Sequence, residues 1–163
     1  MNLVFQNLLT EDFRYNVKFL EKKRNMIMDG DFVKLVYSDE CMAINSIYFT
    51  CTLKCKNEDC RDTRQDEKCM IWFAPYDPVN KREIEKIVKY EQILIEEYIE
   101  QMHCRKSPMF LLKNQLLSGN MRLYKMHHVQ QPPTTMVVKI SGIWESNEHF
   151  GITYKFLECT AAT

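Results

Sequence analysis

Residues 136–156 read MVVKISGIWESNEHFGITYKF, which is two alternating apolar runs joined by a polar connection. Successive side chains of an extended strand point to opposite faces, so Met136, Val138 and Ile140 share one face of the first run. The corresponding apolar face of the second run consists of Phe150, Ile152, Tyr154 and Phe156. The pattern predicts a β-hairpin with one buried face. Its other face carries lysines and hydroxyls, which suits a sheet that binds a polyanion.

The composition is that of a globular domain. The 163 residues are 45% hydrophobic and 27% charged, with 9 phenylalanines, 8 tyrosines and 2 tryptophans, so we expect a single domain over 1–163 with a packed core. The net charge is zero. Nucleic-acid binding must therefore rest on local clustering of basic residues.

The sequence shows no sign of membrane insertion or secretion. No apolar stretch approaches the roughly 18 residues that cross a bilayer. The first residues lack a basic flank and reach acids at Glu11 and Asp12, unlike a secretory signal. We therefore expect an intracellular protein, not secreted, with no membrane partner and with its seven cysteines reduced.

The remaining elements follow from periodicity. We expect an N-terminal helical or extended arm over 1–24, which carries a loose helical stripe, and a core over 25–163. Strands are predicted at 31–37, 43–55, 69–74 (as a central strand) and 121–126, and residues 56–68 are predicted to be an exposed loop. Apolar residues at three- and four-residue spacing predict a helix over 80–104, with Asn80 as its N-cap. Residues 109–117 are compatible with a strand or a short helix. The order predicts a mainly β (α+β) fold, an antiparallel oligonucleotide-binding (OB)-like barrel with one long helix after the third strand.

Basic residues are concentrated in one span of the sequence. Between Gln101 and Trp144 there is no Asp or Glu, whereas six lysines and arginines and three histidines fall there. Interleaved aromatic and basic side chains bind single-stranded nucleic acid by stacking and charge. The competing interpretation is a solvated basic edge that protects the sheet from aggregation.

On the nucleic-acid hypothesis, two groups of side chains carry the binding. The candidates for contact with phosphates are Lys34, Lys54, Arg122, Lys125, Lys139 and Lys155. The candidates for base stacking are Tyr48, Tyr124 and Trp144.

The cysteines and histidines give little support to a reactive site. Cys51, Cys55, Cys60 and Cys69 follow the spacing C-x3-C-x4-C-x8-C, which could hold zinc, but neither pair has the two-residue gap of usual structural sites. Buried free thiols are the alternative. No HExxH, glycine-rich phosphate loop or nucleophile elbow is present. We therefore expect no catalytic residues, no cofactor and no enzymatic activity.

Three segments together resemble a family. EKKRNMIMDGDFVKLVYS (21–38), NQLLSGNMRLYK (114–125) and KISGIWE…FGITYKF (139–156) resemble small uncharacterised proteins of large double-stranded DNA viruses. The last segment also resembles the final hairpin of phage and viral single-stranded DNA-binding proteins with OB folds. The resemblance implies binding roles for Lys139, Trp144, Thr153, Tyr154 and Lys155.

The leading functional hypothesis is therefore a viral single-stranded DNA-binding (or RNA-binding) protein of DNA replication or packaging, located in the host nucleus or a cytoplasmic virus factory. The alternative is a non-catalytic structural or virion interaction protein that forms homo-oligomers or binds other viral subunits. An exposed apolar surface without salt-sensitive DNA binding would favour this alternative.

Overall fold

A large mixed β-sheet and one long helix dominate the fold. The computed structural model describes residues 12–27, 29–59, 68–124 and 135–159, with the backbone alone at 57–59 and 68. In this part of the chain the main path of the sheet runs β1 (Val17–Arg24), β2 (Asp31–Ser38), β9 (Thr135–Glu145), β10 (His149–Glu158), β8 (Asn120–Tyr124), β6 (Lys68–Phe73) and β5 (Cys55–Asp59). Three further strands pair beside this path, namely β3 (Ala43–Asn45), β4 (Ile47–Thr52) and β7 (Ser107–Pro108).

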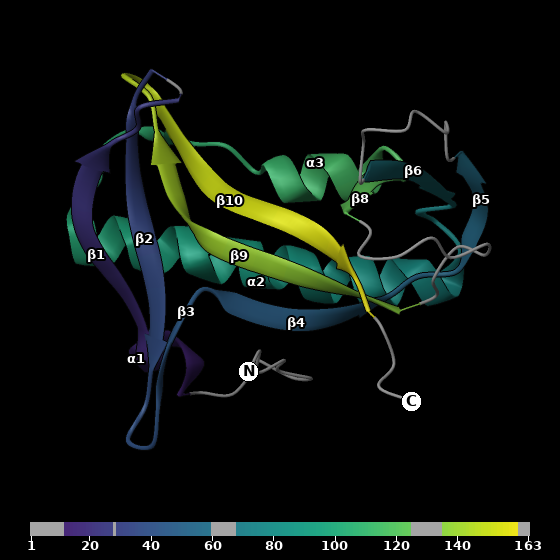
Figure 1. The fold of residues 1–163 in the computed structure, drawn as a ribbon, viewed down its shortest axis with the longest axis horizontal. Helices are drawn as coiled ribbons and strands as arrows, with labels where there is room; N and C mark the ends of the chain where they lie inside the picture. Colours follow the sequence, from purple (N-terminus) through teal and green to yellow (C-terminus); the bar gives the residue numbers. More distant parts are fainter. Residues whose placement is uncertain (1–11, 28, 60–67, 125–134, 160–163) are drawn as a thin grey trace.

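The helices are α1 (Phe13–Asn16), α2 (Pro78–Met102) and α3 (Leu111–Leu117). Figure 1 shows α2 lying along one side of the sheet, with β1 and β2 near one of its ends and β5, β6 and β8 near the other. Strands β9 and β10 cross between these two groups. The fold is thus mainly β and of α+β type, as predicted, and the described sheet does not close on itself.

The sheet departs from the antiparallel expectation at β10, which pairs in parallel with both β7 and β8. Strand β9 precedes β10 and runs antiparallel to it, so the turn between them makes β10 run in the same direction as β8. Parallel pairing with β8 is limited to two residue pairs, Phe156 with Leu123 and Leu157 with Tyr124. Beyond these pairs no pairing joins the two strands.

The predicted hairpin is confirmed, with one irregularity. Strands β9 and β10 pair antiparallel, and the apolar faces read from the sequence are the buried ones at Val138, Ile140, Ile152 and Phe156. The register shifts between Thr153 and Tyr154, so Ser141 is an extra residue on β9, and its hydroxyl donates to the Thr153 carbonyl at 3.4 Å. A β-bulge of this kind reverses which side chains face the core beyond it.

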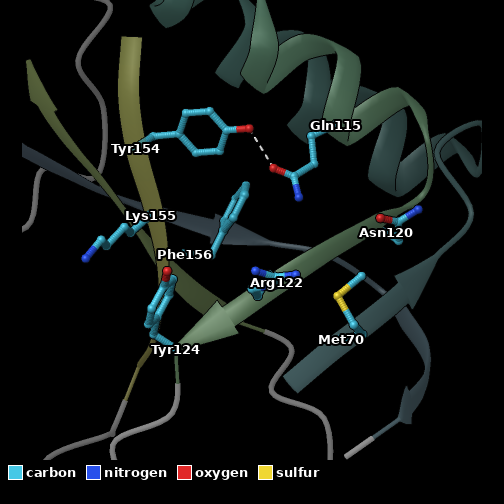
Figure 2. A pocket seen from close by; sticks show the side chains of 8 residues that line it. All are labelled: Met70, Gln115, Asn120, Arg122, Tyr124, Tyr154, Lys155 and Phe156. Atoms are coloured by element: carbon cyan, nitrogen blue, oxygen red, sulfur yellow. Dashed lines mark hydrogen bonds between the residues drawn. The ribbon is translucent and has the colours of Figure 1, made fainter. Parts of the chain in front are cut away.

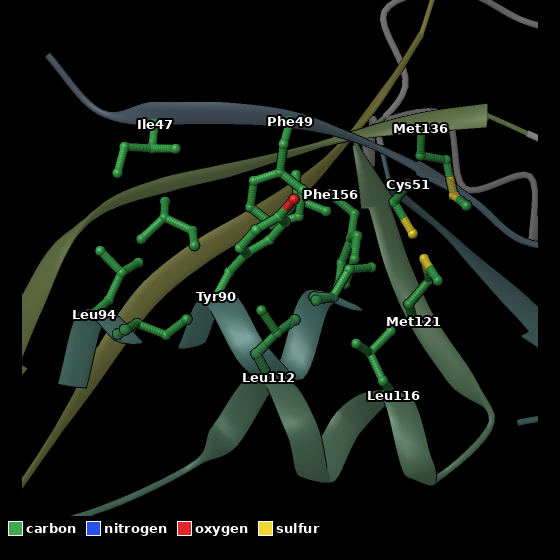
Figure 3. Packing of buried hydrophobic residues seen from close by; sticks show 14 of the residues in the cluster. Ile47, Phe49, Cys51, Tyr90, Leu94, Leu112, Leu116, Met121, Met136 and Phe156 are labelled. Carbon is green, nitrogen blue, oxygen red and sulfur yellow. The ribbon is translucent and has the colours of Figure 1, made fainter. Parts of the chain in front are cut away.

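The core lies between the sheet and the two longer helices. Figure 3 shows Phe49 of β4 against Tyr90 of α2, with Leu112 and Leu116 of α3 closing the same cluster. The rings of Phe49 and Tyr90 meet edge to face at 4.8 Å. Helix α3 therefore packs its apolar face into the core beside α2. Of the two possibilities for residues 109–117, the structure shows the helix, over 111–117.

Several boundaries differ from the predictions. The exposed loop predicted at 56–68 is wrong at its start, because residues 55–59 form β5 against β6. Strand β6 has only β5 beyond it in the described sheet, so it is not central, and its Trp72 is exposed. The helical stripe predicted within 1–24 fails from Val17 onward, because β1 pairs with β2 there.

The long helix is confirmed, but it begins two residues early. Asp77 is its N-cap and accepts a hydrogen bond from the backbone N–H of Val79 at 3.0 Å, with Pro78 at the first helical position. Asn80, the predicted cap, is instead fully buried within the first turn. Its amide bonds the backbone N–H and carbonyl of Lys54 at 2.7 and 3.2 Å, which ties the start of α2 to the end of β4.

Candidate nucleic-acid interface

Four side chains on adjacent strands form a tyrosine–lysine row, defined as Tyr48 (β4), Lys139 (β9), Lys155 (β10) and Tyr124 (β8). Tyr48 is the direct cross-strand partner of Lys139, and Lys139 is the direct partner of Lys155. The ammonium of Lys139 lies 5.6 Å from the ring centroid of Tyr48, and that of Lys155 lies 5.0 Å from that of Tyr124. These are cation–π distances. The row lies on the outer face of the sheet, opposite the helices.

The local alternation of each strand places the row there. Val138 and Ile140, which flank Lys139, are fully buried, and Phe156 beside Lys155 is 1% exposed. Because neighbours along a strand face opposite sides, the two lysines lie on the outer face, where Lys155 is exposed and Lys139 is half-buried. Arg122 is exposed and stands two residues before Tyr124, so it belongs to the same face.

A pocket opens next to the row where β8 and β10 diverge. Its volume is about 410 Å³. Figure 2 shows its lining, with residues from β6, α3, β8 and β10. The lining residues are Met70, Gln115, Asn120, Arg122, Tyr124, Tyr154, Lys155 and Phe156. Two members of the row, Tyr124 and Lys155, therefore also border the pocket.

The polar groups of the pocket are held in place. The Tyr154 hydroxyl donates to Oε1 of Gln115 at 2.6 Å, and it also lies 3.3 Å from the carbonyl oxygen of Leu111 (Figure 2). Burial, with a smaller contribution from the carboxylate of Glu91, raises the pKa of Tyr154 to about 12. The hydroxyl therefore keeps its proton and remains a donor at neutral pH.

The structure brings together five of the nine predicted binding residues, namely Tyr48, Arg122, Tyr124, Lys139 and Lys155. Lys34 is exposed and pairs with Gly142, beyond the bulge on the same edge of β9. Lys54 lies between β4 and β5, where its ammonium is 3.9 Å from the Asp77 carboxylate. Lys125 lies outside the described residues.

Trp144 has a different environment from that of the row. It is the direct partner of Gly151 on β10, and a Cβ placed on Gly151 would lie 3.1 Å from the indole ring. The half-buried indole therefore covers a glycine and also pairs with Phe32 of β2. The protein therefore covers part of the indole face that a base would stack on.

The sequence does not mark Met70, Gln115 or Asn120 as site residues, and it places Phe156 only in the core. No local pattern marks them, because the pocket exists only through the pairing of β10 with β8 and the packing of α3 between them. Tyr154 was indicated by resemblance alone.

The cysteines do not form a described metal site. Cys51 is fully buried, and burial raises the pKa of its thiol, which opposes the thiolate that zinc requires. No group of three or more His, Cys, Asp or Glu side chains within the described ranges is placed to hold a metal ion. Cys60 lies outside those ranges.

A second polar cluster surrounds the buried carboxylate of Glu145, on the inner face beyond the bulge. It accepts hydrogen bonds from Lys106 at 2.5 Å, from Lys22 at 2.7 Å and from the Tyr98 hydroxyl. Burial acts to raise the pKa of Glu145, but these donors outweigh burial and lower the pKa to about 2. The cluster joins β1, α2 and the chain before β7 to β9, and we interpret it as structural.

Comparison with known proteins gives no match to a family model, a curated protein or a solved structure. In the part of the chain that the structure describes, no helix is both long enough and apolar enough to span a bilayer. The functional argument therefore rests on the geometry of the site.

Proposed function

We propose that this protein binds single-stranded nucleic acid across the outer face of its sheet. The observation that carries the proposal is the tyrosine–lysine row, in which two adjacent lysines are flanked by tyrosines. The ammonium groups lie 5.6 Å and 5.0 Å from the ring centroids of Tyr48 and Tyr124. On this proposal a base stacks on each ring, and the neighbouring ammonium pairs with a phosphate of the strand. Stacking on aromatic rings requires bases released from a duplex, which favours a single strand.

The charges on this face support an anionic ligand. Lys139 and Lys155 are direct cross-strand partners, and like charges so placed repel each other. Among the residues that the structure describes, no carboxylate forms an ion pair with Lys139, Lys155 or Arg122. A phosphate backbone along the row would supply the missing negative charge.

The biological setting is a separate part of the proposal. The resemblance of 139–156 to the final hairpin of phage and viral single-stranded DNA-binding proteins supports an OB-like use of the sheet in viral DNA replication or packaging. An intracellular location, in the host nucleus or a virus factory, follows from that role. No step of the proposal requires a catalytic residue.

Fluorescence anisotropy with a labelled oligonucleotide tests the proposal. We expect binding that weakens linearly on a plot of log K against log salt concentration, with a slope of about −0.7 for each phosphate contacted on a single strand. The double variant Lys139→Ala/Lys155→Ala should lose most of this slope. Lys89→Ala, at an exposed position on α2, is the matched control and should bind as the wild type does. Absent or salt-independent binding would refute the proposal.

One observation favours the interaction protein as the second candidate. Met26 and Ile27, at the turn between β1 and β2, are 92% and 94% exposed. These two adjacent apolar side chains form a surface that another chain could cover. Light scattering after gel filtration distinguishes the two: a wild-type oligomer that dissociates in Met26→Ser/Ile27→Ser, with no DNA binding, would support this candidate.

A further inference from the structure

The pocket beside the tyrosine–lysine row has the properties of a site for a single base. Its volume of about 410 Å³ falls within the roughly 300–1,000 Å³ of small-ligand pockets. Its floor is aromatic, because the rings of Tyr154 and Phe156 meet edge to face at 5.8 Å. Its rim carries Arg122 and Lys155, which can neutralise a phosphate while a base points inward (Figure 2).

The amide of Gln115 gives the pocket a fixed hydrogen-bond donor. The Tyr154 hydroxyl donates to Oε1 of Gln115 at 2.6 Å, so the oxygen end of the amide is bound and the Nε2 end is left for a ligand. Within the described residues, no hydrogen bond from the Gln115 Nε2 group is present. Figure 2 shows this nitrogen directed into the pocket, away from Tyr154. Gln115 is half-buried, and an amide N–H group that bonds no protein acceptor favours a ligand that brings one.

We propose that this pocket takes one unstacked base of the bound strand and that Gln115 donates to a base carbonyl, with thymine or uracil preferred over adenine. Thymine and uracil carry a carbonyl on each side of the ring N–H, so the donor meets an acceptor in either orientation of the base. Adenine accepts only at its ring nitrogens, and the paired contact that a glutamine amide makes with adenine N6 and N7 also uses Oε1, which Tyr154 already occupies here. This inference rests on the proposed function, because the strand must first bind along the row.

The path of the strand follows from the same geometry. Tyr124 and Lys155 belong both to the row and to the wall of the pocket. A strand stacked on Tyr124 therefore passes the mouth of the pocket, and the neighbouring base can leave the stack and enter. The pocket adds selectivity to the otherwise sequence-tolerant binding of stacked bases.

The test compares oligothymidylate and oligoadenylate of equal length by anisotropy titration, for the wild type and for Gln115→Leu and Gln115→Glu. Both variants remove the donor, and the glutamate keeps an oxygen for the Tyr154 hydroxyl. The measured quantity is the ratio of the affinity for oligothymidylate to the affinity for oligoadenylate. Self-stacking of free oligoadenylate changes this ratio equally for all the proteins, so a difference between variants reports the contribution of the pocket. We expect the ratio to fall about three- to tenfold, as the loss of one hydrogen bond implies.

Gln92→Leu is the matched control, because Gln92 is exposed on α2 and its amide bonds Glu96 at 3.0 Å, outside the pocket. It should leave the ratio unchanged. Circular dichroism melts establish that each variant folds, and the ¹⁵N side-chain amide signal of Gln115 in the wild type should shift on adding oligothymidylate. An unchanged ratio and an unmoved signal, with salt-sensitive binding retained, would overturn the base pocket alone. No binding of either oligonucleotide by the wild type would overturn the proposed function.

Discussion

Lys139 of β9 and Lys155 of β10 are direct cross-strand partners, and each ammonium lies over a tyrosine ring on its own side of the pair. Two like charges in this position cost a sheet stability in the absence of a ligand, although the rings offset part of the repulsion. Replacing one lysine should therefore relieve repulsion in the free protein while weakening binding of an anion.

The first prediction concerns this trade between stability and binding. Lys155→Met keeps the apolar stem and removes the charge, so the urea midpoint should stay equal or rise slightly. The affinity for an oligonucleotide at low salt should fall, and the salt slope should shrink by about 0.7. Chemical denaturation and anisotropy titrations measure the two effects. A fall in stability together with unchanged affinity would contradict a role in binding.

The second prediction separates the ring of Tyr124 from its hydroxyl. Tyr124→Ala removes the stacking surface and should weaken binding by about 1–3 kcal/mol. Tyr124→Phe keeps the ring under Lys155 and should bind nearly as the wild type does. Anisotropy at fixed salt compares the three proteins. Equal losses in both variants would assign the effect to the hydroxyl and contradict stacking.

The third prediction concerns Glu145 and acid stability. The folded-state pKa of about 2 lies below the ordinary value of 4.5, so the ionised carboxylate stabilises the folded state above about pH 4.5. This stabilisation is lost as the pH falls from about 4.5 towards 2. Glu145→Gln should remove this dependence and cost on the order of 3 kcal/mol at neutral pH, because two lysines lose their shared counter-charge. Urea titrations at several pH values measure both.

Lys22→Met serves as the comparison for Glu145→Gln. It leaves the carboxylate paired with Lys106 at 2.5 Å, so its loss of stability should be clearly smaller. If the two variants lose equal stability, the shared carboxylate is not the centre of the cluster.

The fourth prediction concerns Glu91, which holds the start of α3. Its two carboxylate oxygens accept the backbone N–H groups of Leu112 and Lys113 at 3.0 and 2.8 Å. Glu91→Ala should release the first turn of α3 and cost about 1–3 kcal/mol, because one buried and one part-buried donor lose their partner. Hydrogen exchange of these two amides should accelerate, while that of the Val138 amide in β9 tracks only the global loss. Unchanged exchange at Leu112 would contradict the assignment.

The pH dependence of Glu91 should run opposite to that of Glu145. Burial raises the pKa of Glu91, against the lowering effect of its backbone hydrogen bonds. A carboxyl group with a raised folded-state pKa disfavours the folded state as it ionises, so its contribution to stability declines as the pH rises through that pKa. In Glu145→Gln/Glu96→Gln, which removes the opposing effects of Glu145 and of Glu96, stability should therefore fall with rising pH in the weakly acidic range.

The sequence predicted those features that depend on neighbours along the chain. Alternation identified the hairpin at 136–156, and helical spacing identified α2, because each element buries one regular face. The parallel pairing of β10 with β8 could not be predicted, since it depends on contacts between distant segments. The cap at Asp77 was missed because Asn80, two residues after Pro78, also fits the N-cap preference, and only its burial against Lys54 distinguishes the two.

The candidate site divides in the same way. Alternation within one hairpin predicts Lys139 and Lys155, and alternation in the run 43–55 predicts Tyr48. Tyr124 is indicated by its place between Arg122 and Lys125. The role of Gln115 could not be predicted from the sequence. A glutamine on a short amphipathic helix has no distinctive pattern, and only the packing of α3 beside β10 brings it to the pocket. Lys54 was placed with the row because the alternation was extended past the end of β4, where the chain turns towards Asn80.

The extra residue at Ser141 has a consequence for how this protein can vary. On one side of it lies Lys139, directed outward, and on the other lie Trp144, also directed outward, and Glu145, directed inward towards Tyr98. Deleting one residue here would remove the bulge and restore regular alternation along β9, so the side chains of Trp144 and Glu145 would exchange faces. Deletion of one residue would thus place Glu145 on the outer face with Lys139, and Trp144 on the inner face beside Lys22 and Lys106. Insertions and deletions at this point should therefore be far less tolerated than substitutions.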